Sequence, residues 1–253
     1  MAFMDSYEGN KQRTDRWIAT YPQGRLETLI VEFHAEKGYV LVQAKAFRNQ
    51  LETEPAGVDY AHGYLAAYPE KIVREVIALA NTEGGDLLIG VDDDGTVSGQ
   101  RFIEEEIFVM EKAIRELIFP ALIFEVFTIK LTEKKGVAVF RIPLSSERPH
   151  YLKSGEKKQS FIRVADRSVQ ASREVWEVLK KSRTPKDIVF TYGRKEEILM
   201  KALGEYGKIT LKEYTKIAGI PIFLASKTLV RLVAANVLAI HPQETEDYFT
   251  LKE

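Results

Sequence analysis

Cations that alternate with aromatic side chains between residues 150 and 175 are the groups in this chain best suited to binding chemistry. The cations are Lys153, Lys157, Lys158, Arg163, Arg167 and Arg173, and the aromatic residues among them are Tyr151 and Phe161. Lysine and arginine neutralise phosphates, and aromatic rings stack on exposed bases, so the combination favours single-stranded nucleic acid. Arg163 stands between two apolar residues and would point away from their core face on a strand. The alternative is a solvated strand edge, with Arg163 paired to an acid.

A second group of polar residues opens a predicted helix over residues 225–237. Its members are Ser226, Lys227, Thr228 and Arg231. Lys227 and Arg231 are four residues apart and therefore project from one face of a helix. In a helix-turn-helix the third helix enters the major groove and its early residues contact phosphates and base edges. We therefore predict Ser226, Lys227 and Arg231 as nucleic-acid contacts.

The same C-terminal block is open to a second interpretation. Residues 244–247 contain three acids and would lie in the wing, where they would repel phosphates. In that case the block is a protein-interaction or dimerisation module whose charges only keep it soluble.

Residue patterns for catalysis are weaker. The four histidines have no metal-ligand spacing, and Gly-x-Ser-x-Gly and P-loop patterns are missing from the sequence. Glu52 and Glu54 follow Lys45 rather than precede it, and the acids at 92–94 stand before Gly95 as in a solvated turn. We predict no catalytic residue, no metal and no cofactor.

Composition narrows the partners further. The 253 residues carry a formal net charge of −1, so a nucleic-acid site must be a local patch. The lack of cysteine excludes disulfides, thiolate zinc sites and cysteine nucleophiles. No signal-peptide pattern and no apolar run of bilayer length are seen, so we expect a cytoplasmic protein that does not bind membranes.

The elements that must position these residues are clearest between residues 72 and 95. Val73, Val76, Ile77 and Ala80 recur at helical spacing and predict a helix with one apolar face. Two glycines at 84–85 end it, residues 87–91 form a short apolar run typical of a buried strand, and Asp-Gly at 94–95 predicts a hairpin turn.

This string resembles the signature of the Schlafen/AlbA-like DNA-binding domain family, in which a helix ending AxANTxGG precedes LxIGVDDDG. Further similarities follow in the family's order, at residues 118–120, 137–143, 148–151 and 161–167. The resemblance covers about residues 68–180 and implies an α+β fold, a mixed sheet with flanking helices. It also implies nucleic-acid binding, and some relatives cut RNA with a metal-holding carboxylate cluster.

The N-terminal segment, residues 1–66, departs from that family. Residues 26–34 and 39–47 predict a β-hairpin, and residues 21–25, 42–47 and 61–63 resemble phage proteins that handle single-stranded DNA. The family's first strand carries a Glu-x-Lys pattern, whereas residues 42–45 offer lysine without the glutamate. Either the hairpin replaces that strand or the domain begins atypically.

The remaining pattern divides the chain into domains. Helices are predicted over 104–117 and 172–181 and strands over 124–130, 137–142 and 161–164, and residues 184–186 predict a linker. Predicted helices at 195–205, 211–218 and 225–237 precede strands at 239–241 and 248–251, a pattern typical of a winged helix-turn-helix. We predict a β-hairpin segment (1–66), a Schlafen/AlbA-like domain (67–183) and a winged helix-turn-helix domain (190–253).

We therefore predict a nucleic-acid-binding protein, a DNA-binding transcriptional regulator that prefers DNA to RNA and does no covalent chemistry. The alternatives are a metal-dependent endoribonuclease of the Schlafen type and a non-catalytic protein-interaction scaffold. A homodimer is expected from the class, because doubling the contacts raises affinity through effective concentration.

Overall fold

The computed structural model describes residues 39–42, 69–91, 97–154, 157–165, 167–183 and 192–252. Contacts divide the chain into two compact units, each described by itself below. The first comprises Met1–Ser145 and His150–Lys158, and the second Ser146–Pro149 and Gln159–Glu253. The predicted hairpin over 26–34 and 39–47 lies outside the described residues except for 39–42, as do the 94–95 turn and the 184–186 linker. The division into three domains stays a prediction.

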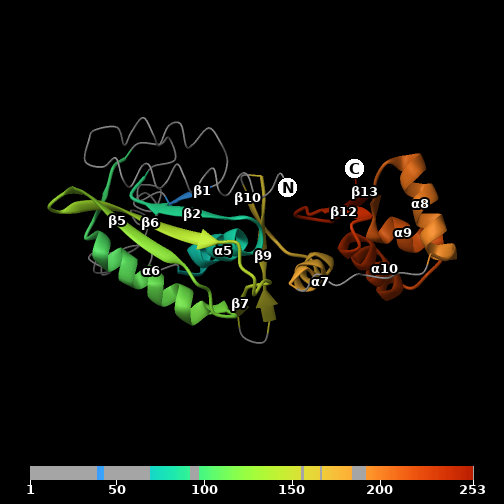
Figure 1. The fold of residues 1–253 in the computed structure, drawn as a ribbon, viewed down its shortest axis with the longest axis horizontal. Coiled ribbons are helices and arrows are strands. Elements are labelled where there is room, and N and C mark those ends of the chain that lie inside the picture. The colour runs from blue at the N-terminus through green and yellow to red at the C-terminus, as the bar shows by residue number, and fades with distance from the viewer. Residues whose placement is uncertain are drawn as a thin grey trace, which may run out of the picture. The chain divides into compact units, whose positions relative to one another are not determined.

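The first unit contains a five-stranded sheet. Its strands are β1 (Tyr39–Val42), β2 (Gly84–Ile89), β3 (Gln100–Arg101), β5 (Glu125–Thr132) and β6 (Lys135–Pro143). Strand β6 pairs antiparallel with β2, β3 and β5, and Figure 1 shows β2, β6 and β5 side by side. Strand β1 pairs parallel with β2, which requires a crossover connection, and the helix before β2 lies in that connection.

Two helices, α5 (Pro69–Asn81) and α6 (Ile103–Leu117), contact each other and the sheet. The four apolar residues of the sequence pattern in α5 have no exposed surface, which confirms the predicted apolar face. At the end of β2, Gly90 has φ +98, and a Cβ there would lie 2.9 Å from the backbone of Gln100 and Gly136. Glycine is therefore required at this close approach of three backbone segments.

A second, small sheet in the first unit has the order β4–β7–β8. Its strands are β4 (Ile118–Phe119), β7 (Tyr151–Ser154) and β8 (Lys157–Gln159). Ile118 pairs with Leu152, and each has only 1% of its surface exposed. Their burial anchors one face of this small sheet to the core of the unit.

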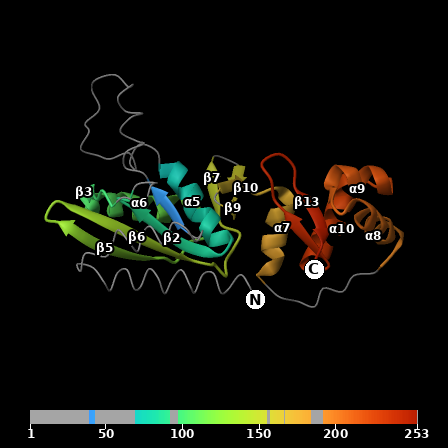
Figure 2. The ribbon, with the colours of Figure 1, turned by 90° about the horizontal axis from the view of Figure 1, so that it is seen from above.

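The second unit begins with an antiparallel pair, β9 (Phe161–Val164) and β10 (Arg167–Gln170), followed by α7 (Arg173–Ser182). The helices that follow are α8 (Arg194–Tyr206), α9 (Leu211–Ala218) and α10 (Ile222–Ala234). Three strands, β11 (Ile209–Thr210), β12 (Leu238–His241) and β13 (Tyr248–Leu251), form an antiparallel sheet of order β11–β13–β12. Figure 2 shows α8, α9 and α10 lying together beside β13.

Apolar side chains from α8, α9, α10, β11, β12 and β13 share one core. Its fully buried members include Leu199 of α8, Tyr214 of α9, Leu229 of α10 and Phe249 of β13. The mixed sheets and helices confirm the predicted α+β class, while the winged helix-turn-helix stays a prediction. Among the described residues no single helix is long and apolar enough to cross a membrane. The α9–α10 pair meets that criterion only jointly and is bent by 115°.

Candidate nucleic-acid interface

One face of the β4–β7–β8 sheet carries two aromatic rings. Phe119 lies directly opposite Tyr151 in the strand pairing, so both side chains leave the sheet on the same side. Their ring centroids are 6.1 Å apart with planes inclined by 30°. Phe119 remains 39% exposed although it is a large apolar side chain, and Tyr151 is half-buried. A partly exposed aromatic pair therefore lies on the outer side of this sheet.

Three lysines of the predicted set accompany that pair. Lys153 is two residues beyond Tyr151 on β7 and therefore points to the same side. The ammonium of Lys158 lies 4.7 Å from the centre of the Tyr151 ring, a cation–π contact that holds this charge beside the aromatic pair. Lys153, Lys157 and Lys158 are all exposed, and Lys157, which precedes Lys158 on the outer strand β8, leaves that strand on the opposite side. We call Phe119, Tyr151, Lys153, Lys157 and Lys158 the lysine–aromatic surface.

A buried amide fixes the start of β7. Asn81, at the end of α5, is 1% exposed. Its Oδ1 accepts a hydrogen bond from the backbone N–H of His150 at 2.7 Å, and its Nδ2 donates to the His150 carbonyl at 3.0 Å. These two bonds fix the backbone immediately before Tyr151. Asn81, the first residue of the Asn-Thr-Glu-Gly-Gly part of the sequence pattern, therefore has a structural role in placing the lysine–aromatic surface.

The His150 side chain completes the same buried network. Its Nδ1 lies 2.9 Å from the Pro120 carbonyl oxygen and its Nε2 lies 2.6 Å from the Ser145 hydroxyl. Because a carbonyl only accepts, Nδ1 carries a proton, and Nε2 of a neutral ring then accepts from the hydroxyl. Pro120 follows Phe119 directly. His150 thus connects the chain next to Phe119 with the chain next to Tyr151.

The other predicted cations of this region lie in the second unit. Arg163 of β9 is half-buried, and its guanidinium donates to the Ser168 hydroxyl at 3.1 Å on the neighbouring strand. Arg167 of β10 is exposed and forms an ion pair with Glu244 at 3.3 Å. Phe161 is only 7% exposed and does not offer its ring for stacking. The three lysines of the predicted strip therefore lie together in the first unit. Arg163 and Arg167 belong to the second unit.

Helix α10 presents only part of the predicted contact set. Lys227 is exposed and Arg231 is half-buried. Ser226 is 8% exposed, and its hydroxyl donates to the Glu174 carboxylate of α7 at 2.5 Å. Helix α7 packs against this side of α10. Ser226 is thus engaged inside the unit, whereas Lys227 lies on the face that α7 leaves open.

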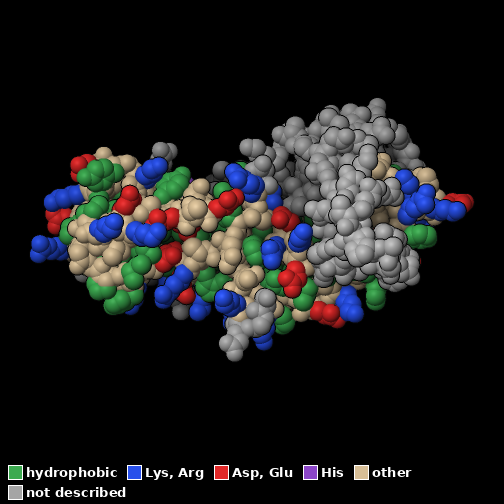
Figure 3. All heavy atoms as spheres, turned by 180° about the vertical axis from the view of Figure 1, so that it is seen from behind, with side chains coloured by type: hydrophobic (Ala, Val, Ile, Leu, Met, Phe, Trp, Pro, Cys, Tyr) green, Lys and Arg blue, Asp and Glu red, His purple; other side chains and the backbone are tan. Residues whose placement is uncertain are grey.

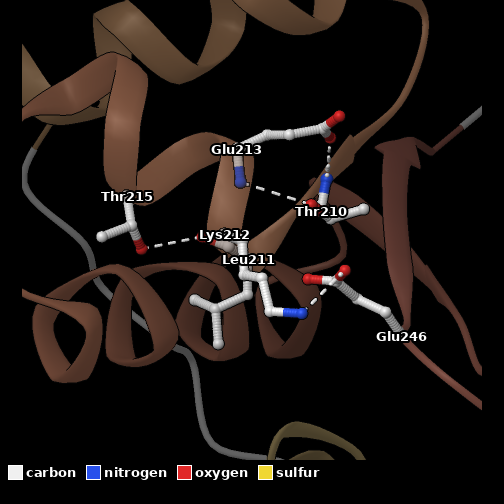
Figure 4. Close-up of polar contacts among 6 residues, drawn as sticks. All are labelled: Thr210, Leu211, Lys212, Glu213, Thr215 and Glu246. Atoms are coloured by element: carbon white, nitrogen blue, oxygen red, sulfur yellow. Dashed lines mark hydrogen bonds and ion pairs between the residues drawn. The ribbon is translucent and has the colours of Figure 1, made fainter.

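The acids between β12 and β13 are paired within the second unit. Glu246 accepts from Lys212 of α9 at 3.3 Å, as Figure 4 shows beside the capping box of Thr210 and Glu213. Asp247 accepts from the hydroxyl of Ser172 at 2.5 Å. With the Glu244 pair described above, each of these acids has a polar partner. Their charge is therefore partly balanced by residues of the same unit.

Charges on the described part of the face in Figure 3 are interspersed: Lys and Arg side chains alternate with Asp and Glu side chains. A continuous positive band is not seen on that part of the face.

A buried ion pair that the sequence pattern did not reveal joins Arg141 and Asp86 across β6 and β2, with Nε and Oδ1 3.1 Å apart. Within the described ranges, no three His, Asp or Glu side chains gather so that they could hold a metal ion.

Comparison with known proteins identifies the domain that carries this surface. Residues 54–172 match the sequence model of the Schlafen, AlbA_2 family. The chain contains a Schlafen AlbA_2 domain. A comparison with curated proteins found no match. Among solved structures, the DIP2311 protein from Corynebacterium diphtheriae is similar at 17% sequence identity and a TM-score of 0.46. That similarity covers 90% of this chain and 37% of the chain of that protein.

The AlbA_2 match ends at Ser172, whose side chain caps α7 by accepting from the Val175 N–H. The match therefore includes β4, β7 and β8 with the whole lysine–aromatic surface, and it also includes β9 and β10. Phe119 is the residue of this surface that the sequence pattern did not mark. It was seen only as part of the motif at 118–120, and nothing in that motif predicts an exposed ring.

Proposed function

We propose that the protein binds nucleic acid and that the lysine–aromatic surface of its AlbA_2 domain makes the principal contact. The observation that supports this proposal most is the gathering of three exposed lysines with two aromatic rings on one small sheet. Lysine on an outer strand also protects a sheet edge from aggregation, and that alone would explain β8. It does not explain Lys153, which lies on the central strand β7.

We further propose that the protein is a DNA-binding regulator. The order of three helices followed by two antiparallel strands in the second unit supports a winged helix-turn-helix, with α10 as its third helix. Lys227 and Arg231 would then contact backbone phosphates. A homodimer is part of the same proposal, because it would double these contacts.

A second function has its own supporting observation. Ile217, Ile222 and Phe223, at the turn between α9 and α10, are 48%, 56% and 64% exposed. Large apolar side chains exposed together are typical of protein-binding surfaces. The second unit is therefore also a candidate protein-interaction module.

The test is a set of fluorescence-anisotropy titrations of the whole chain with single-stranded DNA, duplex DNA and RNA at low and moderate salt. The proposal expects binding at low salt that weakens as salt rises, because phosphate contacts release counterions. The variant carrying Lys153→Gln, Lys157→Gln and Lys158→Gln should bind more weakly than the unchanged protein. Without binding of any nucleic acid at low salt, the protein-interaction function is favoured instead. Cleavage of the RNA on addition of Mg²⁺ or Mn²⁺ would show an endoribonuclease.

A further inference from the structure

We infer that the lysine–aromatic surface is a site for single-stranded nucleic acid, in which an unpaired base stacks on the ring of Phe119. This inference rests on the proposed nucleic-acid function and names the class of its ligand. The supporting observation is the position and exposure of Phe119. A site that bound only phosphates would not need an exposed aromatic ring.

The geometry allows Phe119 to offer a ring face. Its pairing partner Tyr151 supports it from one side at a centroid distance of 6.1 Å, while 39% of Phe119 stays exposed. Behind the pair, Ile118 and Leu152 are buried and hold both strands in place. Phe119 is therefore a ring fixed in position before any ligand arrives, so little conformational entropy is lost when a base stacks on it.

The lysines supply the phosphate contacts for the same strand. Lys158 is held over Tyr151 at 4.7 Å, and Lys153 leaves β7 on the side of the two rings. A single strand needs both kinds of contact, a basic surface along its backbone and aromatic rings for its bases. The chain provides both within one three-stranded sheet.

Magnitudes favour a single strand over a duplex. Stacking of a base on an aromatic side chain contributes about 1–3 kcal/mol. In a duplex the bases already stack on one another, and separating one step costs about a few kcal/mol, which offsets that gain. An unpaired base gains the stacking without that cost. Single-stranded DNA and RNA offer the same base faces, so the experiment includes both.

The experiment measures fluorescence anisotropy of the whole chain with four labelled ligands. Three of them are single strands of about 20 nucleotides, which is longer than common single-strand sites: oligothymidine, oligouridine and an oligomer with abasic positions in place of the bases. The fourth is a duplex. The variant is Phe119→Ala. The matched control is Phe108→Ala, because Phe108 on α6 is also a highly exposed phenylalanine, at 68%.

The expected result is that Phe119→Ala weakens oligothymidine binding about 5- to 150-fold, the equivalent of about 1–3 kcal/mol. Phe108→Ala should leave the affinity unchanged, and the abasic oligomer should bind the unchanged protein and Phe119→Ala equally. Equal loss with oligouridine extends the site to RNA, and loss with oligothymidine alone restricts it to DNA.

Two results would overturn the inference while leaving nucleic-acid binding intact. One is equal affinity of the unchanged protein for oligothymidine and for the abasic oligomer, which needs no variant and so does not depend on how a variant folds. The other is a loss of duplex affinity in Phe119→Ala as large as its loss of oligothymidine affinity. Failure of all four ligands to bind would reject the proposed nucleic-acid function itself.

Discussion

The salt dependence of binding offers the most direct measure of the lysine–aromatic surface. Its lysines Lys153, Lys157 and Lys158 are all exposed and can each neutralise one phosphate. Counterion release from a single strand gives a slope of about −0.7 per phosphate in a plot of log affinity against log salt, so three contacts predict about −2. Affinity should then fall roughly 20-fold between about 50 and 200 mM salt. On B-DNA the same three contacts predict a slope of about −2.7.

The assay is a series of anisotropy titrations over that salt range with the unchanged protein and each single Lys→Gln variant. Each substitution should make the slope shallower by about 0.7 on a single strand. Lys201→Gln serves as the control, because Lys201 is exposed on α8 and forms its ion pair with Glu197 there. A slope that the triple variant leaves unchanged, or that Lys201→Gln reduces equally, would refute the assignment of phosphate contacts to β7 and β8.

Three further predictions concern stability. Asn81→Ala should lower the free energy of unfolding by about 2–5 kcal/mol in urea unfolding followed by circular dichroism, because two buried backbone groups of His150 lose their partner. A smaller loss would show that water replaces the amide. Burial first, then the charge of a nearby glutamate, raises the pKa of Tyr214 to about 12 from 10.0. The native state therefore holds this proton more tightly, so stability present below pH 10 should be lost as pH rises through 12, by up to about 2.7 kcal/mol in total. Tyr214→Phe should lessen that alkaline loss in thermal unfolding at several pH values, and an equal loss in both proteins would contradict the cause. Asp86→Ala should cost about 3–5 kcal/mol, because it leaves Arg141 as a buried charge without its ion-pair partner. Retention of the melting temperature would show that the pair does not stabilise the fold.

Elements with strong local signals could be predicted from sequence. Helix α9 has the predicted bounds because Thr210 and Glu213 form a capping box at its start and Gly219, at φ +62, ends it. Helix α10 begins three residues earlier than predicted, at Ile222. Its N-cap is Pro221.

Several short strands could not be predicted from the sequence pattern. Strands β3, β4, β7, β8, β10 and β11 were not predicted, because each has only two to four residues and lacks the apolar run or the alternation that marked the predicted strands. Several of them pair with strands far along the chain, β3 with β6, β4 with β7 and β11 with β13. Phe119 and Tyr151 are 32 residues apart in sequence, and their contact depends on the Asn81–His150 network. The place of Phe119 in the candidate site therefore required the fold, whereas Tyr151 and the lysines were visible in the sequence.

Packing of α7 on α10 restricts what the second unit can do with DNA. The major groove is about 12 Å wide and admits one helix of about 10–12 Å diameter. Two packed helices with axes about 8–10 Å apart are too broad to enter it together. Ser226 of α10 donates a hydrogen bond to Glu174 of α7, so α7 covers the Ser226 side of α10. That side of α10 cannot face the base edges in the groove while α7 stays in place. Lys227 and Arg231 can still reach backbone phosphates, which position a protein without reading sequence. Reading of base edges by the Ser226 side of α10 would therefore require α7 to move, whereas phosphate contacts from the side that carries Lys227 would not.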